Sequence, residues 1–260
     1  MSVPRPRWLL LDGSDAPQAS AALADTFAHV SRSWLFEGTE LHALREQGPT
    51  LVDLDDCPVL AERAHQEPRI WRGLLLYSEA STAQLLAHLR RMLTVSVGLH
   101  HRALLSYYSP YTASYFFDAC DARELSRWLG PVRQLSWFGG TWADRAIGFE
   151  GWQQLSNPGL VTGPLAIQEC LSQGQLDKLQ TCLLEQHAWQ WSETTGTDYE
   201  RLWSHLQEGL ALGFSERAVL DEWLWLRLQY PAYTPASTLP GLTPREHLEC
   251  LRYLWKNNKP

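Results

Sequence analysis

Two short runs of almost unbroken apolar residues place the strongest constraint on the fold. One is "WLLL" (Trp8–Leu11), which an Asp-Gly pair stops, and the other is "GLLLY" (Gly73–Tyr77). A strand that is apolar at every position is buried on both faces, whereas a strand with one face in water alternates apolar and polar residues. The first part of the chain therefore predicts a buried sheet with flanking helices.

The segments around these runs alternate between strand and helix signals up to about residue 140. Ser81 and Gln84 have the spacing of a helix capping box, as do Asp121 and Glu124, and Gly98 is expected in the turn of a hairpin. We expect strands at 7–13, 33–38, 50–55, 71–78, 94–108 (the hairpin) and 131–140, and helices at 17–31, 39–48, 57–66, 81–93 and 121–130.

The character of the sequence changes after Gly140, where an irregular stretch is followed by helical patterns alone. Thr243, Pro244 and Glu246 form a strong helix start, with a cap, a proline at the first helical position and a glutamate at N3. The expected helices are 164–173, 175–191, 198–212, 215–230 and 244–256. The sequence therefore predicts an N-terminal α/β lobe with a mixed sheet over residues 1–140, followed by an all-helical lobe over residues 141–260.

The acidic stretch Leu35–Asp55 raises the question of a metal site. Asp53 and Asp55 flank Leu54 at strand spacing, so both carboxylates lie on one face at a strand end. Divalent cations bind such oxygens, but a calcium loop also requires an alternating acidic pattern with a glycine and a closing glutamate, which this stretch lacks. We therefore expect solvated carboxylates on a scaffold and no metal.

The motifs of known enzyme classes give no strong candidate for a catalytic site. The histidines form no H-E-x-x-H or H-x-x-x-H pair for zinc, and the chain has neither a G-x-S-x-G elbow nor a P-loop. The sequence thus favours a protein that is not an enzyme and has no catalytic residues and no cofactor. The alternative is a hydrolase assembled from distant residues, in which Asp12, Glu37, Asp53 or Asp55 meets a histidine in a pocket.

Composition restricts the partners and the compartment. A net charge of −7 disfavours nucleic acid and anionic membranes as partners. No stretch approaches the ~20 apolar residues of a transmembrane helix, and the N-terminus does not resemble a signal peptide. Five cysteines, scattered without a C-x-x-C pair, are typical of reduced thiols. We therefore expect a cytoplasmic protein that does not insert into membranes.

Aromatic residues are the signal that remains, because thirteen tryptophans is a high count for this length. The stretch "LDEWLWLRLQYPAY" is apolar around nearly the whole helix circumference, so it is either a core helix or a helix that offers one face to a partner. Tryptophan and tyrosine are favoured anchors of protein interfaces. Arg90 and Arg91 either meet an acidic partner or are solvated at a helix end. The candidate binding residues are Trp191, Tyr199, Trp203, Trp223, Trp225, Tyr233, Arg90 and Arg91.

Four segments together resemble a known bacterial family. They are "WLLLDGSDAP", "SWLFEGTELHALREQGPTLVDLD", "RGLLLYSEASTAQLLAHLRRMLTVSV" and "RALLSYYSPYTASYFFDACDARELSRWLGPVRQLSW". In this order they resemble the domain of unknown function 4123 over roughly residues 7–138, with the most specific similarity at 35–55 and 73–95. The chain departs from the family at Ser106, Ser109 and Pro110, where relatives often carry an arginine and an Asp-Pro pair.

The resemblance implies a role in type VI secretion. Members of the family act as adaptor chaperones that hold a toxic effector in the cytoplasm and help to load it onto the VgrG spike, with no known catalytic residues. The helical lobe shows no family pattern, so we expect the choice of cargo to reside there. A structural component of the secretion machine is a further alternative.

Overall fold

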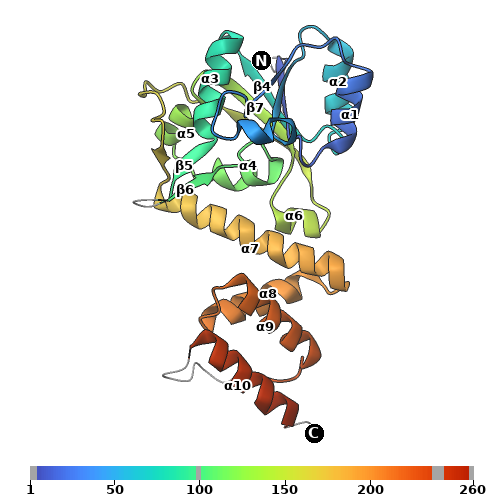
Figure 1. Ribbon diagram of the computed structural model, residues 1–260, viewed down its shortest axis with the longest axis vertical. Helices are drawn as coiled ribbons and strands as arrows, with labels where there is room; N and C mark the ends of the chain where they lie inside the picture. The colour runs from blue at the N-terminus through green and yellow to red at the C-terminus, as the bar shows by residue number, and fades with distance from the viewer. Residues whose placement is uncertain (1–4, 98–100, 236–242, 258–260) are drawn as a thin grey trace. The chain divides into compact units, whose positions relative to one another are not determined.

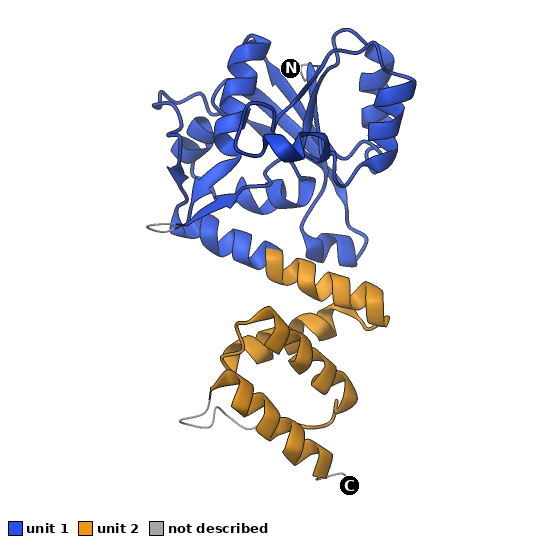
Figure 2. Ribbon diagram, viewed as in Figure 1, with its two compact units in different colours: residues 1–182 blue, residues 183–260 orange. Residues whose placement is uncertain are grey.

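The computed structural model describes residues 5–97, 101–235 and 243–257. The chain divides into two compact units, residues 1–182 and residues 183–260 (Figure 2). Among the described residues, the strands all lie in unit 1, and unit 2 consists of helices and their connections. The predicted fold class, an α/β region followed by helices, is confirmed.

A six-stranded sheet forms the centre of unit 1 (Figure 1). Its strands follow the order β2-β3-β1-β4-β7-β8, and every neighbouring pair is antiparallel. The strands are β1 (Trp8–Leu11), β2 (Arg32–Trp34), β3 (Thr50–Asp53), β4 (Gly73–Ser78), β7 (Val132–Gly139) and β8 (Gly151–Ser156). The two all-apolar runs are β1 and β4, which pair with each other at the middle of the sheet.

Helices cover both faces of this sheet, as the apolar runs predict. Leu9 and Leu11 belong to a core with α1 and α2, whereas Trp8 and Leu10 belong to a core with α3, α4 and α5. This division follows from the pleat, because successive side chains of a strand point to opposite faces. The helices are α1 (Pro17–Asp25), α2 (Pro58–Gln66), α3 (Thr82–Met92), α4 (Pro110–Phe116) and α5 (Ala122–Leu129).

Local signals in the sequence fix several helix ends. The Ser81 hydroxyl and the Gln84 side chain form the capping box of α3, and Asp121 with Glu124 forms that of α5, so both predictions are confirmed. The helix expected at 39–48 is a shorter 3-10 helix, η1 (His42–Gln47). Helix α4 was not among the expected elements.

The segment after residue 140 differs from the prediction. It contains α6 (Trp142–Ala146) and β8, and the expected helix 164–173 is wrong because β9 (Glu169–Cys170) lies there. β9 pairs in parallel with β5 (Thr94–Ser96), which pairs in antiparallel fashion with β6 (Arg102–Leu104). The expected hairpin turn at Gly98 lies outside the described residues. Since β8 and β9 join sheets of unit 1, the units divide at residues 182 and 183 rather than at 140.

Unit 2 is built from the second half of α7 and three further helices. Their bounds are α7 (Gln173–Thr195), α8 (Tyr199–Ala211), α9 (Arg217–Gln229) and α10 (Pro244–Asn257). The predicted start of α10 is confirmed, because the Glu246 amide donates to the Thr243 hydroxyl and the Glu246 carboxylate accepts from the Thr243 amide at 2.8 Å. The core of this unit gathers around Phe214, Trp223 and Trp255.

Candidate partner-binding surfaces

Two of the aromatic residues predicted to bind a partner lie in the core of unit 2 instead. Trp223 is fully buried, its ring packs at 5.5 Å from that of Phe214, and its Nε1 donates to the carbonyl oxygen of His205 at 2.6 Å. Tyr199 is buried at the start of α8. The prediction of exposure is wrong for both. On α9, which is apolar nearly all round, Trp223 turns inward, and on the amphipathic α8 Tyr199 lies on the buried face with Leu202 and Leu206.

One aromatic pair of the predicted set does reach the surface. Trp225 is 54% exposed, and its ring meets that of the half-buried Trp191 edge to face at 5.0 Å. The Trp191 Nε1 donates to Asp221 Oδ1 at 2.9 Å, and the same oxygen lies 3.1 Å from His187 Nε2. Asp221 therefore fixes the orientation of Trp191. We call the exposed surface of Trp191 and Trp225, with Asp221, the tryptophan surface.

The remaining aromatic candidates, Trp203 and Tyr233, are half-buried. The backbone carbonyl of Tyr233 accepts a hydrogen bond from Arg227 Nη1, and its ring packs at 5.7 Å from Trp255. Tyr233 thus packs within unit 2, and the ring of Trp203 is partly covered. Neither residue joins the tryptophan surface through a contact that the structure records.

A buried polar cluster supports the helices behind these aromatics. Arg227 is 7% exposed, lies 5.7 Å from the ring centres of both Trp223 and Trp255, and pairs with Glu208 at 2.9 Å. Its Nε also donates to His205 Nδ1 at 3.3 Å. Burial, together with the charge of Arg227, lowers the pKa of His205 to about 4. Burial likewise raises the pKa of Glu208.

The two arginines at the end of α3 have different surroundings. Arg90 is half-buried, and its Nε donates to the Leu35 carbonyl oxygen while its Nη2 donates to that of Trp34, each at 3.1 Å. Leu35 and Pro49 face each other just beyond the β2–β3 ladder, where the Leu35 amide donates to the Pro49 carbonyl oxygen at 2.9 Å. Proline has no N–H to bond the Leu35 oxygen in return. Arg90 therefore completes the edge of the sheet, whereas Arg91 is exposed.

The far edge of the six-stranded sheet is open, and reasoning from sequence missed it. β8 lies at the end of the strand order with β7 as its neighbour, and all of its residues are exposed or half-buried. An apolar corner lies beside its first residue, where Phe149 is 76% and Ile147 68% exposed. An adjoining pocket of about 510 Å³ includes Phe138, Trp152 and Ile70. The signal for this surface in the sequence was the closely spaced Ile147, Phe149 and Trp152 in "RAIGFEGW".

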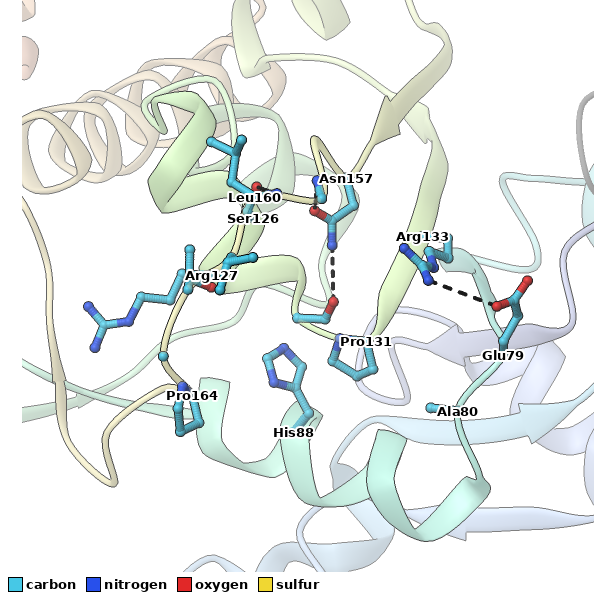
Figure 3. A pocket seen from close by; sticks show the side chains of 15 residues that line it. Glu79, Ala80, His88, Ser126, Arg127, Pro131, Arg133, Asn157, Leu160 and Pro164 are labelled. Carbon is cyan, nitrogen blue, oxygen red and sulfur yellow. Dashed lines mark hydrogen bonds and ion pairs between the residues drawn. The ribbon is translucent and has the colours of Figure 1, made fainter.

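A second pocket of about 760 Å³ lies beneath the loop that follows β8 (Figure 3). His88 rises from α3 into it, and its Nε2 donates to the Trp128 carbonyl oxygen at 2.8 Å. Burial lowers the pKa of His88, so the ring is neutral at pH 7. The side-chain amide of Asn157 donates to the carbonyl oxygen of Gly130, and Arg127 pairs with Glu169 at 2.7 Å. These polar groups hold the loop and the helix end together, so the pocket has a structural role.

Of the four carboxylates named for a hydrolase site, Glu37 is exposed and the other three have other partners. Asp12 is buried and accepts from the Ser14 hydroxyl at 2.9 Å, and burial raises its pKa. Asp53 accepts from the Asp55 amide at 3.0 Å, and Asp55 pairs with Arg7 at 2.9 Å. Within the described ranges, no recorded contact joins these carboxylates to a histidine, and no three His, Cys, Asp or Glu side chains are placed to hold a metal ion.

The comparison with protein families gives one match. Residues 7–127 match DUF4123, a domain of unknown function. The matched DUF4123 region runs from β1 to α5 and leaves out β7, β8 and unit 2. Neither the curated proteins nor the solved structures contain a match to the chain. In the part of the chain that the structure describes, no helix has the length and apolar character needed to cross a membrane.

Proposed function

We propose that the protein is a cytoplasmic adaptor chaperone that binds a type VI secretion effector and helps to load it onto a VgrG spike protein, without catalysis. Two findings support the proposal. The four segments quoted above resemble this family over residues 7–138, and residues 7–127 match DUF4123. The tryptophan surface lies outside the matched region, in unit 2, where adaptors for different cargoes are free to differ.

The observation that carries the proposal is the exposed ring of Trp225. More than half of this large side chain is in water, although Trp191 and Asp221 hold its surroundings in a defined geometry. A partner that covers such a ring gains the free energy of burying its apolar area, and tryptophans at the centre of an interface often dominate binding. The Asp221 carboxylate beside it supplies a polar rim that selects among apolar partners.

The test is an affinity purification of the tagged full-length chain from the cells that encode it, with bound proteins identified by mass spectrometry. The wild type is expected to recover one large toxin, with or without VgrG. Trp225→Ala is expected to reduce recovery at least about tenfold, the effect of losing roughly 1.4 kcal/mol at an interface hot spot. Tyr253→Ala is the control, because Tyr253 is an aromatic residue on α10 that is even more exposed, at 69%.

Three outcomes would contradict the proposal. Recovery of no toxin under conditions in which the toxin is expressed removes its basis and directs attention to a screen for hydrolase activity. An equal loss for Trp225→Ala and Tyr253→Ala moves the contact away from the tryptophan surface. Secretion of the chain together with the spike identifies a structural component of the machine rather than an adaptor that stays in the cytoplasm.

A further inference from the structure

The two edges of the six-stranded sheet are protected very differently. β2 has three residues, begins with the positively charged Arg32, and has its last carbonyl oxygen occupied by Arg90. β8 has six residues, "GWQQLS", with no charge and no proline. Proteins normally block exposed edges with charges, prolines, bulges or short strands, because an open edge pairs with another strand. β8 has none of these devices.

The hydrogen-bonding pattern shows which backbone groups of β8 are available. The backbone amide of Asn157, the residue after β8, donates to the Arg133 carbonyl oxygen at 2.9 Å. Asn157 and Arg133 are therefore a hydrogen-bonded pair that continues the β7–β8 ladder. Because such pairs alternate with non-bonded pairs along antiparallel strands, the N–H and C=O groups of Trp152, Gln154 and Ser156 point away from β7. Among the described residues, no other segment forms a backbone hydrogen bond with these three.

We propose that β8 pairs with β8 of a second copy of this chain, in antiparallel orientation, with Gln154 on the two-fold axis. The proposal is independent of the role in secretion. In this register Gln154 lies opposite Gln154 of the partner subunit, and Trp152 lies opposite Ser156 of the partner subunit. The three outward-facing residues of each copy then form about six backbone hydrogen bonds, and the two sheets become one. A single patch that complements itself is what a two-fold dimer requires.

The residues that flank β8 favour a second copy over a foreign strand. Phe149 and Ile147 are exposed before the strand, and Leu160 (50%) and Val161 (100%) are exposed after it. Antiparallel pairing brings the residues before β8 in one copy close to the residues after β8 in the other copy, so these apolar side chains gain contacts at both ends of the paired strands. A strand from another protein would need an apolar group beyond each of its ends to make the same contacts, whereas a second copy of β8 already carries both.

Charge also permits the pairing of two copies. Neither β8 nor the apolar residues that flank it carries a charge. Glu150, the residue just before the strand, is paired with Arg69 at 3.1 Å and accepts from the Tyr111 hydroxyl at 2.7 Å, so its charge is balanced within its own copy. No like charges therefore meet across the proposed axis, whereas like charges directly opposite one another destabilise strand pairs.

The first experiment is disulfide trapping of Gln154→Cys in a Cys170→Ser background, which removes the exposed native thiol. In a hydrogen-bonded antiparallel pair the two Cα atoms are about 5.5 Å apart, within the range of about 4.4–6.8 Å that a disulfide spans. Mild oxidation is expected to convert most of the protein into a covalent dimer. Gln153→Cys is the matched control, because its side chain points to the other face and lies opposite Leu155 of the partner subunit.

The second experiment follows the wild-type chain and needs no variant. Sedimentation from about 1 to about 100 µM, a range that suits a weak dimer, is expected to show the mass rising from one chain to two. Hydrogen exchange at the Trp152 and Gln154 amides is expected to slow over the same range, while the Gln153 amide, bonded to β7, stays protected throughout. Gln154→Lys, which places two ammonium groups at the axis, is expected to remain a monomer, and Gln153→Lys to dimerise.

Three results would overturn the inference. The first is a single-chain mass and unchanged exchange across the whole range. The second is equal trapping of the Gln153→Cys and Gln154→Cys variants, which indicates random collision. The third is a dimer that Gln154→Lys leaves intact, which locates the contact elsewhere. Far-UV circular dichroism establishes for each variant that the chain is folded before its mass is interpreted.

Discussion

The Nη2 atom of Arg90 lies 3.1 Å from the carbonyl oxygen of Trp34, the last residue of β2. Its Nε bonds the next carbonyl, that of Leu35, at the same distance. Replacing Arg90 with alanine leaves the Leu35 oxygen without a donor among the described residues, whereas the Trp34 oxygen keeps a bond from the Glu37 amide at 3.3 Å. A hydrogen bond from a charged group contributes about 1.5–3 kcal/mol. We expect Arg90→Ala to lower the free energy of unfolding by about 2–3 kcal/mol, measured by urea titration.

Arg91→Ala is the control for that measurement. The side chain of Arg91 is adjacent in sequence, carries the same charge and is exposed, so we expect its loss to change the unfolding free energy by only about 0.5 kcal/mol. Equal effects of the two substitutions would mean that the charge at the end of α3, rather than the two carbonyl contacts, stabilises this region.

Two tryptophans that are two positions apart on α9 are expected to behave in opposite ways. Trp223 is fully buried against Phe214 and Trp255, and Trp223→Ala should destabilise unit 2 by about 3–5 kcal/mol. Trp225 is largely exposed, so Trp225→Ala should change stability by less than about 1 kcal/mol while it affects partner binding. Hydrogen exchange of the amides in α8, α9 and α10 measures the change in stability of unit 2 in each of the two variants.

This contrast shows where reasoning from the sequence stops. Apolar periodicity identified α9 as a helix, but a helix that is apolar all round does not reveal which tryptophan faces solvent. Which tryptophan is buried depends on where α8 and α10 pack against α9. On α8, for example, Gly209 leaves room for the ring of Trp223, because a side chain at position 209 would collide with that ring. Arg90 is a similar case, because its role follows from a proline, Pro49, on a different segment.

The strands were predictable from the sequence to different degrees. The fully apolar runs of β1 and β4 and the capping boxes of α3 and α5 are local signals, and the structure confirms them. β8 and β9 have weak local signals and exist because β7 and β5 offer them a ladder. In β9, the buried Glu169 also bonds Arg127 and the Ala166 amide, contacts that a helical pattern cannot reveal.

The stability of unit 2 is expected to depend on pH through His205. Its pKa is lowered to about 4 by burial and by Arg227 and Arg201, whereas in the unfolded chain it is about 6.5. Between these two values the unfolded state binds the proton and the folded state does not, so stability falls as the pH decreases from about 6.5 to about 4. Above pH 6.5 the His205 contribution is constant.

His205→Gln isolates this effect, because a glutamine oxygen can still accept from Arg227 but does not titrate. We expect the variant to lose part of the decline in unfolding free energy between pH 6.5 and 4 that the wild type shows. The comparison is made by difference, since the raised pKa of Glu208 acts in the opposite sense in both proteins. His101→Gln, an exposed histidine, serves as control, and equal slopes for His205→Gln and wild type would contradict the prediction.

Proline substitutions in β8 test the assignment of its backbone groups. The amide of Gln153 faces β7, whereas that of Gln154 faces the open edge. Gln153→Pro therefore removes a ladder hydrogen bond and is expected to destabilise unit 1 by about 3 kcal/mol, whereas Gln154→Pro removes an unused donor and is expected to cost less than about 1 kcal/mol. Thermal unfolding of the two variants at low protein concentration measures this difference. The reverse order would exchange the inward-facing and outward-facing residues, and Gln153 rather than Gln154 would then point away from β7.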